Sequence, residues 1–151
     1  MKQAQPLDVV IVEDEPLIAM DIQFMIEDAG HNVLAMAASL REAEALPVDP
    51  APDVAFVDIQ LAENSSGFDV SALIQQRWPA TFIVFVTANI SKIPQDFAGA
   101  HGVIAKPFSS HGFLNALQYL QEGISDPPPD MPQPGSFIAA PRIAALWGSD
   151  T

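Results

Sequence analysis

The chain has 151 residues, 49% of them hydrophobic, and this size is enough to bury one core without disulfides or a structural metal. Its 19 acidic and 6 basic residues give a formal net charge of -13, which repels nucleic acid phosphates and anionic lipid surfaces, so we expect neither as a partner. The lack of cysteine excludes disulfides, thiolate catalysis and cysteine-based zinc sites, and it fits the cytoplasmic location that we expect.

The first predicted strand, residues 7–12, is apolar and leads into the acidic run Glu13-Asp14-Glu15. A helix then begins at Pro16, a residue that suits the first helical position, and ends at Gly30. Residues 1–6 lack the long apolar core of a signal peptide, and no apolar run is long enough to span a membrane. We therefore expect a soluble chain that is not exported.

A weaker second strand at residues 33–37 precedes a short helix. Ser39, followed three residues later by Glu42, is the capping-box pattern that marks a helix start. Pro47 is the first of three prolines that break the chain before the next strand, so this helix is predicted to end near it.

The third predicted strand, residues 54–59, is apolar on both faces and yet carries an acid, Asp58, at its C-terminal end. In open parallel sheets, ligands and chemistry collect at the C-terminal ends of the strands. We therefore interpret Asp58 as a reactive group.

The remaining elements continue the alternation of strand and helix. Pro94 and Gly99 interrupt the region after the fourth strand, so its helix is expected to be short or mobile. Five buried strands alternating with helices predict an α/β fold with a parallel sheet covered on both faces. The predicted elements are a helix at 70–78, a strand at 81–86, a helix at 90–98, a strand at 102–105 and a helix at 108–120.

The composition changes near Gly123, so we predict a domain at residues 1–122 and a tail at 123–151. The tail begins with a proline-rich acidic stretch that is typical of an extended linker, and it ends in an apolar stretch that can form a short helix. We expect Trp147 to anchor this stretch to the domain, with a partner-binding site as the alternative.

The ends of four predicted strands bring Glu13, Asp14, Asp58, Thr87 and Lys106 to one edge of the sheet. Three carboxylates in one crevice repel each other. A divalent cation with oxygen ligands relieves this repulsion, and Mg²⁺ is the cation that we expect here.

This set of residues supports phosphoryl transfer to a carboxylate. Asp58 is the predicted nucleophile, Lys106 pairs with one phosphoryl oxygen, and the Thr87 hydroxyl donates to another. Mg²⁺ neutralises phosphoryl charge, and the small Ala88 leaves room for the group.

At these residues the chain resembles the receiver domain of two-component response regulators, over residues 7–121. The motifs that carry the resemblance are Val12-Glu13-Asp14-Glu15, the Asp58 strand, Phe85-Val86-Thr87-Ala88 and Lys106-Pro107-Phe108. The resemblance implies a flavodoxin-like sheet of five parallel strands in the order 2-1-3-4-5.

The resemblance also implies roles for these residues. Glu13 and Asp14 help to bind Mg²⁺, together with Asp58 and the main-chain carbonyl of Gln60. Asp58 receives its phosphoryl group from a histidine kinase or a histidine phosphotransferase, while Thr87 and Lys106 sense it.

The chain departs from the receiver pattern at Val103. Receivers usually carry an aromatic residue three positions before the conserved lysine, so the common rearrangement of that aromatic residue is not expected here. The chain is similar in part to the atypical alphaproteobacterial receivers of the FAT GUY class, from whose motif it deviates at Val86, Ala88, Asn89 and Ile90.

We predict a stand-alone, phosphorylation-dependent response regulator that signals by protein contact or acts as a phosphate sink. It is not expected to be an enzyme beyond its own phosphorylation and dephosphorylation. The alternatives are a pseudo-receiver that binds proteins without phosphate, and a Mg²⁺-dependent phosphatase, which the missing Asp-x-Asp pair disfavours.

The histidines have no second ligand at metal spacing and are expected at the surface or at strand edges: His31, His101 and His111.

Overall fold

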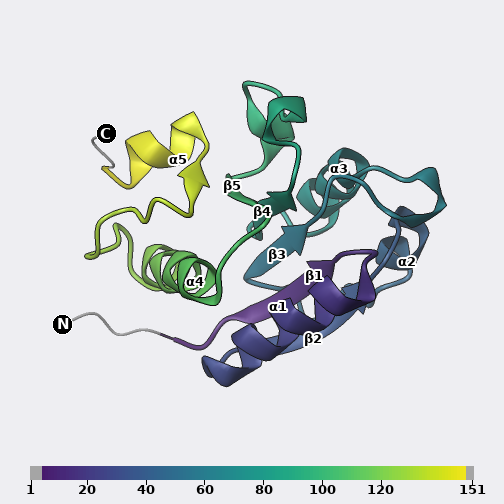
Figure 1. The fold of residues 1–151 in the computed structure, drawn as a ribbon, viewed down its shortest axis with the longest axis horizontal. Helices are drawn as coiled ribbons and strands as arrows, with labels where there is room; N and C mark the ends of the chain where they lie inside the picture. The colour runs from purple at the N-terminus through teal and green to yellow at the C-terminus, as the bar shows by residue number, and fades with distance from the viewer. Residues whose placement is uncertain (1–4, 149–151) are drawn as a thin grey trace.

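The computed structural model describes residues 5–148, so residues 1–4 of the predicted domain and residues 149–151 of the predicted tail lie outside it. One six-stranded sheet has the order β2-β1-β3-β4-β5-β6 (Figure 1). The first five strands are parallel, and β6 runs antiparallel to β5. The strands are β1 (Asp8–Val12), β2 (Asn32–Ala37), β3 (Val54–Val57), β4 (Phe82–Thr87), β5 (Gly102–Ala105) and β6 (Ile138–Ala139).

The flavodoxin-like α/β fold and the order of its first five strands are confirmed. The predicted strand number of five is wrong, because the tail adds β6 to the edge of β5. Every residue of β3 is buried, which explains its continuous apolar run, whereas burial alternates along most of the edge strand β2.

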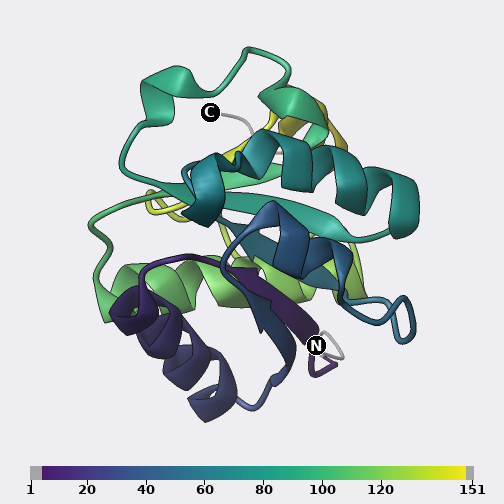
Figure 2. The ribbon, with the colours of Figure 1, turned by 90° about the vertical axis from the view of Figure 1, so that its right-hand side faces the viewer.

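Helices cover both faces of the sheet (Figure 2). Helices α1 and α4 pack on one face around a core that includes Ile26 and Leu117, while α2 and α3 pack on the other around Val57 and Ile74. The helices are α1 (Pro16–Asp28), α2 (Leu40–Glu44), α3 (Gly67–Arg77), α4 (Ser110–Ser125) and α5 (Pro141–Leu146).

Ser39 is confirmed as the N-cap of α2, and the Glu42 side chain reaches back to the amide of the preceding residue, Ala38. The Glu42 amide donates to Ser39 Oγ at 3.1 Å, and the Glu42 side chain accepts from the Ala38 amide at 2.8 Å. These two bonds satisfy amides at the helix start that have no partner inside the helix. They fix the turn that follows β2.

The predicted helix at residues 90–98 is not formed. Two 3₁₀ turns replace it, Ile90–Lys92 and Phe97–Gly99. Pro94 lacks an amide donor, and Phe97 and Ala98 have positive φ angles, so an α-helix cannot continue through this segment. The connection between β4 and β5 is therefore irregular.

The tail packs on the domain instead of extending from it. Helix α4 continues past residue 122 to Ser125, and the chain then returns so that Phe137, Ile143 and Trp147 are buried in the same core as α1 and α4. The burial of Trp147 confirms its predicted anchoring role. Within residues 5–148, no helix combines the length and the apolar character needed to cross a membrane.

The histidine expectation is wrong for His31. This side chain is buried, and its Nδ1 accepts a hydrogen bond from the Leu7 amide at 2.9 Å. Burial lowers its pKa from the usual value. The neutral ring thus ties the start of β2 to the start of β1.

Candidate functional site

The polar residues predicted to meet do come together at the C-terminal edge of the sheet. Glu13 and Asp14 follow β1, Asp58 follows β3, Thr87 ends β4, and Lys106 follows β5. These four strands are parallel neighbours, so their ends lie at one edge. The sheet therefore assembles the site from residues that are far apart in sequence.

Three carboxylates form the acidic part of the site. Glu13, Asp14 and Asp58 each offer an oxygen atom, and these atoms lie within 4.8 Å of one another. Glu13 and Asp58 are buried, while Asp14 is partly exposed. Hard oxygen ligands at this spacing suit a divalent cation such as Mg²⁺, which keeps several waters when bound.

Lys106 supplies the positive charge of the site. Its Nζ lies 3.1 Å from Asp58 Oδ2, 2.9 Å from Glu13 Oε1 and 3.6 Å from Glu15 Oε2. Burial alone lowers the pKa of an ammonium, but the bonds and charges of Glu13 and Asp58 outweigh it and raise the pKa of Lys106. Lys106 is therefore charged at neutral pH.

Glu13 is the most perturbed acid of the site. Burial raises its pKa to about 7, against the lowering effect of the Lys106 ammonium. Its Oε1 forms an ion pair with Lys106 Nζ at 2.9 Å and has no further partner among residues 5–148. A buried carboxylate oxygen with one cationic partner can still be a ligand of a metal ion that lies between the carboxylates. The donor set therefore fits Mg²⁺.

The loop after β3 orients Asp58. The Gln60 amide donates to Asp58 Oδ1 at 3.3 Å, and the proposed metal ligand, the Gln60 carbonyl, belongs to the same peptide segment. Gly67 packs against this loop so closely that a Cβ atom there would lie 2.1 Å from the Asp58 carbonyl oxygen. Sequence reasoning missed this contact.

Thr87 and Lys106 are linked through the backbone. The Lys106 amide donates to the Thr87 carbonyl at 2.9 Å, which ties the ends of β4 and β5 together. The buried Thr87 hydroxyl accepts from the Asn89 amide at 3.0 Å. Its hydrogen can therefore be donated to a group bound near Asp58.

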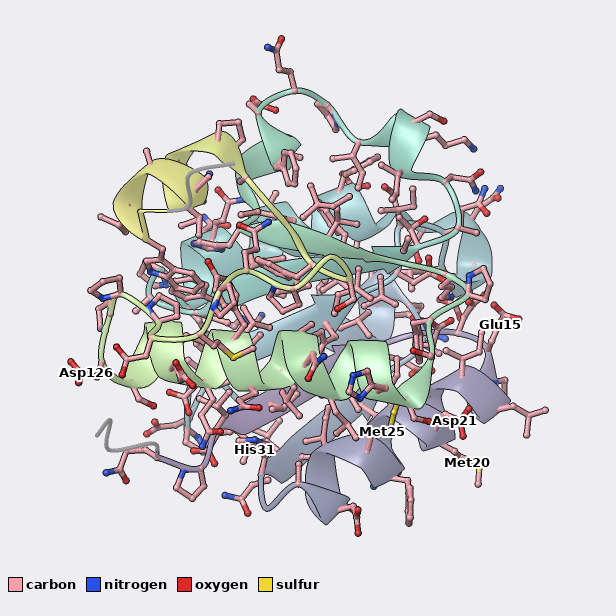
Figure 3. All side chains as sticks on the ribbon, turned by 60° about the vertical axis from the view of Figure 1, so that its left-hand side comes forward. Glu15, Met20, Asp21, Met25, His31 and Asp126 are labelled. Carbon is pink, nitrogen blue, oxygen red and sulfur yellow. The ribbon has the colours of Figure 1, made fainter. Side chains whose placement is uncertain are left out.

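Sequence reasoning placed Glu15 in the acidic run without a role. Glu15 is exposed, but its amide donates to Glu13 Oε2 at 3.1 Å and its carboxylate is a third partner of Lys106. Figure 3 shows Glu15, Met20 and Asp21 at one end of the molecule, beside the first turn of α4. A groove of about 350 Å³ lies there, lined by Ile18, Asp21, Ala88, Lys106, Pro107 and Phe108.

Comparison with known proteins places this geometry in context. The family described as "Response regulator receiver domain" matches residues 9–118. The phyllosphere-induced regulator PhyR of Methylorubrum extorquens is 36% identical over 107 residues, which are 67% of this chain and 38% of that protein. The transcriptional regulatory protein PdtaR of Mycobacterium tuberculosis is 30% identical over 118 residues, 76% of this chain and 57% of that protein.

The chain is also similar in fold to a solved structure. The solution structure of the receiver domain of PhyR from Erythrobacter litoralis has a TM-score of 0.67 and 27% identity, covering 76% of this chain and 89% of that one. The chain spans between about a quarter and three fifths of the length of the curated relatives it matches.

Proposed function

Because this chain belongs to the response regulator receiver domain family, a family of signalling proteins, we propose that it accepts a phosphoryl group on Asp58. One observation carries the proposal: Asp58 is buried, lies 3.1 Å from the Lys106 ammonium, and shares a cation-sized cluster with Glu13 and Asp14. The phosphoryl donor is a histidine kinase or a histidine phosphotransferase. Signalling then occurs by protein contact or by removal of phosphate from that donor.

The residues of the site have separate tasks in this reaction. A carboxylate oxygen of Asp58 forms a bond to phosphorus while the bond from phosphorus to the donor nitrogen breaks, and the electron pair leaves with that nitrogen. Lys106 and the Thr87 hydroxyl stabilise charge on the phosphoryl oxygens. Glu13, Asp14, Asp58 and the Gln60 carbonyl would hold Mg²⁺, which supplies further neutralisation of phosphoryl charge.

The surface beside the site suits a protein donor. Leu17, Met20 and Phe24 form an exposed apolar stripe on α1, with exposed fractions of 79%, 60% and 68%. Two other residues of α1, Ile18 and Asp21, line the groove beside Lys106, and exposed apolar clusters mark protein contact sites. We place the histidine-bearing helix of the donor here.

Phe24→Ser is expected to slow transfer from a phosphorylated histidine domain by tenfold or more, and to leave phosphorylation by acetyl phosphate unchanged.

The irregular segment after Thr87 is expected to respond to phosphorylation. It directly follows the Thr87 hydroxyl, and residues 90–99 contain only two short turns. Amide exchange in residues 88–99 should change when a phosphoryl mimic binds. Amide exchange in residues 88–99 that does not change would contradict this part of the proposal.

Intact-mass spectrometry tests the phosphoacceptor role. Wild type incubated with acetyl phosphate and Mg²⁺ should gain one phosphoryl adduct, while Asp58→Asn should gain none. Asp28→Asn, at the exposed end of α1, is the matched control and should behave as wild type. An adduct that persists in Asp58→Asn would place the phosphoryl group on another residue and contradict the proposal. A wild type that takes none and shows no Mg²⁺-dependent change would favour a phosphate-independent binding protein.

A further inference from the structure

The tail after α4 is built into the fold by two aromatic anchors. Phe137 fills the space above Gly102 of β5, where a Cβ atom would lie 2.4 Å from the ring. Trp147 fills the space above Gly123 of α4, where a Cβ atom would also lie 2.4 Å from the ring. Both aromatic side chains are buried. The domain thus leaves hollows that the tail fills closely.

The tail also covers the outer edge of β5 (Figure 1). Residues Ile138 and Ala139 pair with Val103 and Gly102, and the Ala140 amide donates to the His101 carbonyl at 2.9 Å. Without this pairing, β5 would expose unpaired backbone groups, which are a template for association with another strand. The edge of β5 is therefore an interaction surface that the chain occupies with its own segment.

One contact joins the tail to the start of α4, directly after the loop that carries Lys106. Ser136 Oγ donates to the Gly112 carbonyl at 2.7 Å, in the first turn of α4. Ser109 caps that turn, because its Oγ accepts from the Gly112 amide at 2.9 Å. The acidic site thus holds Lys106 in this loop, and the tail holds the helix turn that follows the loop.

A second contact joins the tail to the irregular segment after Thr87. Arg142 Nη2 donates to the Gly99 carbonyl at 2.7 Å, at the end of the second 3₁₀ turn. The tail therefore contacts both segments that leave the site, the one that follows Thr87 and the one that follows Lys106. Any shift at the strand ends has a direct path to it.

We propose that residues 134–147 form a strap on the β5 edge that favours the unphosphorylated site and loosens when Asp58 is phosphorylated. This inference rests on the proposed function. The Lys106 ammonium, now bonded to Asp58 Oδ2, must follow the phosphoryl oxygens outward from Asp58. The strap has no spare room at Gly102 or Gly123, so a shift of β5 or α4 weakens its fit.

The coupling acts in both directions, because the effect of a bound phosphoryl mimic on the strap equilibrium equals the effect of the strap on the affinity for that mimic. Couplings of this kind are commonly about 5- to 150-fold. A strap that is fixed in place should therefore weaken binding of a phosphoryl mimic at Asp58. Loosening of the strap would also report phosphorylation of Asp58 without the aromatic residue that most receivers carry at the position of Val103.

Amide exchange gives the first test. With beryllium fluoride and Mg²⁺ as the phosphoryl mimic, exchange in residues 137–147 of the full chain should become at least about 5-fold faster in wild type. Asp58→Asn, treated identically, should not change. Exchange in residues 137–147 that is the same with and without the mimic, in a protein whose residues 88–99 do respond, would overturn the strap.

A cross-link gives the second test, and the chain has no cysteine to interfere. A Cβ atom at Gly112 would lie 3.3 Å from the Ser136 Cβ, close to the separation that disulfides need, so Gly112→Cys with Ser136→Cys can lock the strap. The oxidised double variant should bind beryllium fluoride, in the presence of Mg²⁺, at least about 5-fold more weakly than the same protein reduced. Gly112→Cys alone, treated with the same oxidant, is the control.

Different results would overturn the phosphorylation of Asp58 and the role of the strap. If wild type takes no phosphoryl adduct, the proposed function and the strap both fall. If wild type forms the adduct on Asp58 while the oxidised and reduced double variants bind the mimic with equal affinity, only the strap is overturned. Comparing the two redox states of one protein keeps this result independent of any effect of the substitutions on folding.

Discussion

The acidic pocket and the strap both act on β5, and they are built on opposite principles. In the pocket, carboxylates crowd one another, and Glu13 Oε1 has no partner besides Lys106 among the residues described. In the strap, aromatic rings fill hollows that two glycines leave, and the backbone of β5 is paired. The reactive end of the sheet is therefore costly to fold, whereas the tail-covered edge contributes stability.

The largest test of this comparison is removal of a strap anchor. Trp147 stacks on Phe82 with ring centroids 5.4 Å apart and meets Tyr119 edge-on at 5.4 Å. Trp147→Ala should lower the free energy of unfolding by about 3–5 kcal/mol, as for other buried tryptophans. Leu146→Ala, whose side chain is 69% exposed, is the matched control and should change it by about 0.5 kcal/mol or less. Denaturant unfolding measures both, and equal losses would break the comparison.

The next test replaces the buried carboxylate of Glu13, whose ionisation lowers the stability of the native state. Since the pKa of Glu13 is raised from 4.5 to about 7, the native state holds a proton that the unfolded state releases, and stability falls as pH rises through this window. At pH 8, without Mg²⁺, Glu13→Gln should therefore be more stable than wild type by roughly 2 kcal/mol.

Mg²⁺ should reverse this order, because a cation that binds only the native state stabilises it. Thermal unfolding at pH 8 with EDTA and with millimolar Mg²⁺ measures the effect. The expected result is a Mg²⁺-dependent rise in Tm for wild type and little or none for Glu13→Gln. A variant that is less stable than wild type in EDTA would show that the pocket carries no such cost.

The smallest expected effect is the loss of stability in acid that His101, the residue before β5, should cause. Burial, aided by the charge of Arg142, lowers the pKa of His101 to about 4, and its Nδ1 accepts from the Ile83 amide at 2.9 Å. Below its usual pKa of 6.5 the unfolded state takes up the proton first, so stability is lost as pH falls from about 6.5 to about 4. His101→Gln should lose less stability than wild type between pH 7 and pH 5, by about 1 kcal/mol. Equal losses in urea unfolding would contradict this.

The sequence was sufficient to predict the pocket because strand ends dictate it. Asp58 closes a run that is too apolar for an exposed strand, and the order of parallel strands brings Glu13, Thr87 and Lys106 to the same edge. These placements depend on the topology and not on side-chain detail. The roles of the residues in phosphoryl transfer remain predictions.

The strap could not be predicted in the same way. Strand β6 has only two residues, Ile138 and Ala139, which is too short for a periodic pattern. Its position depends on how Phe137 and Trp147 fit Gly102 and Gly123, and such complementarity is visible only in three dimensions. The segment at 90–98 was predicted in part. Pro94 indicated that a helix would be interrupted there, but the sequence did not show that two 3₁₀ turns would replace the helix.

The most direct test of the central claim locates the phosphoryl group itself. Wild type phosphorylated with acetyl phosphate and Mg²⁺ is treated with sodium borohydride, which reduces an aspartyl phosphate to homoserine, and the peptides are sequenced by mass spectrometry. Homoserine is expected at position 58 and at no other aspartate. Homoserine at Asp14 or elsewhere, or its absence from a protein that is folded and binds Mg²⁺, would contradict it.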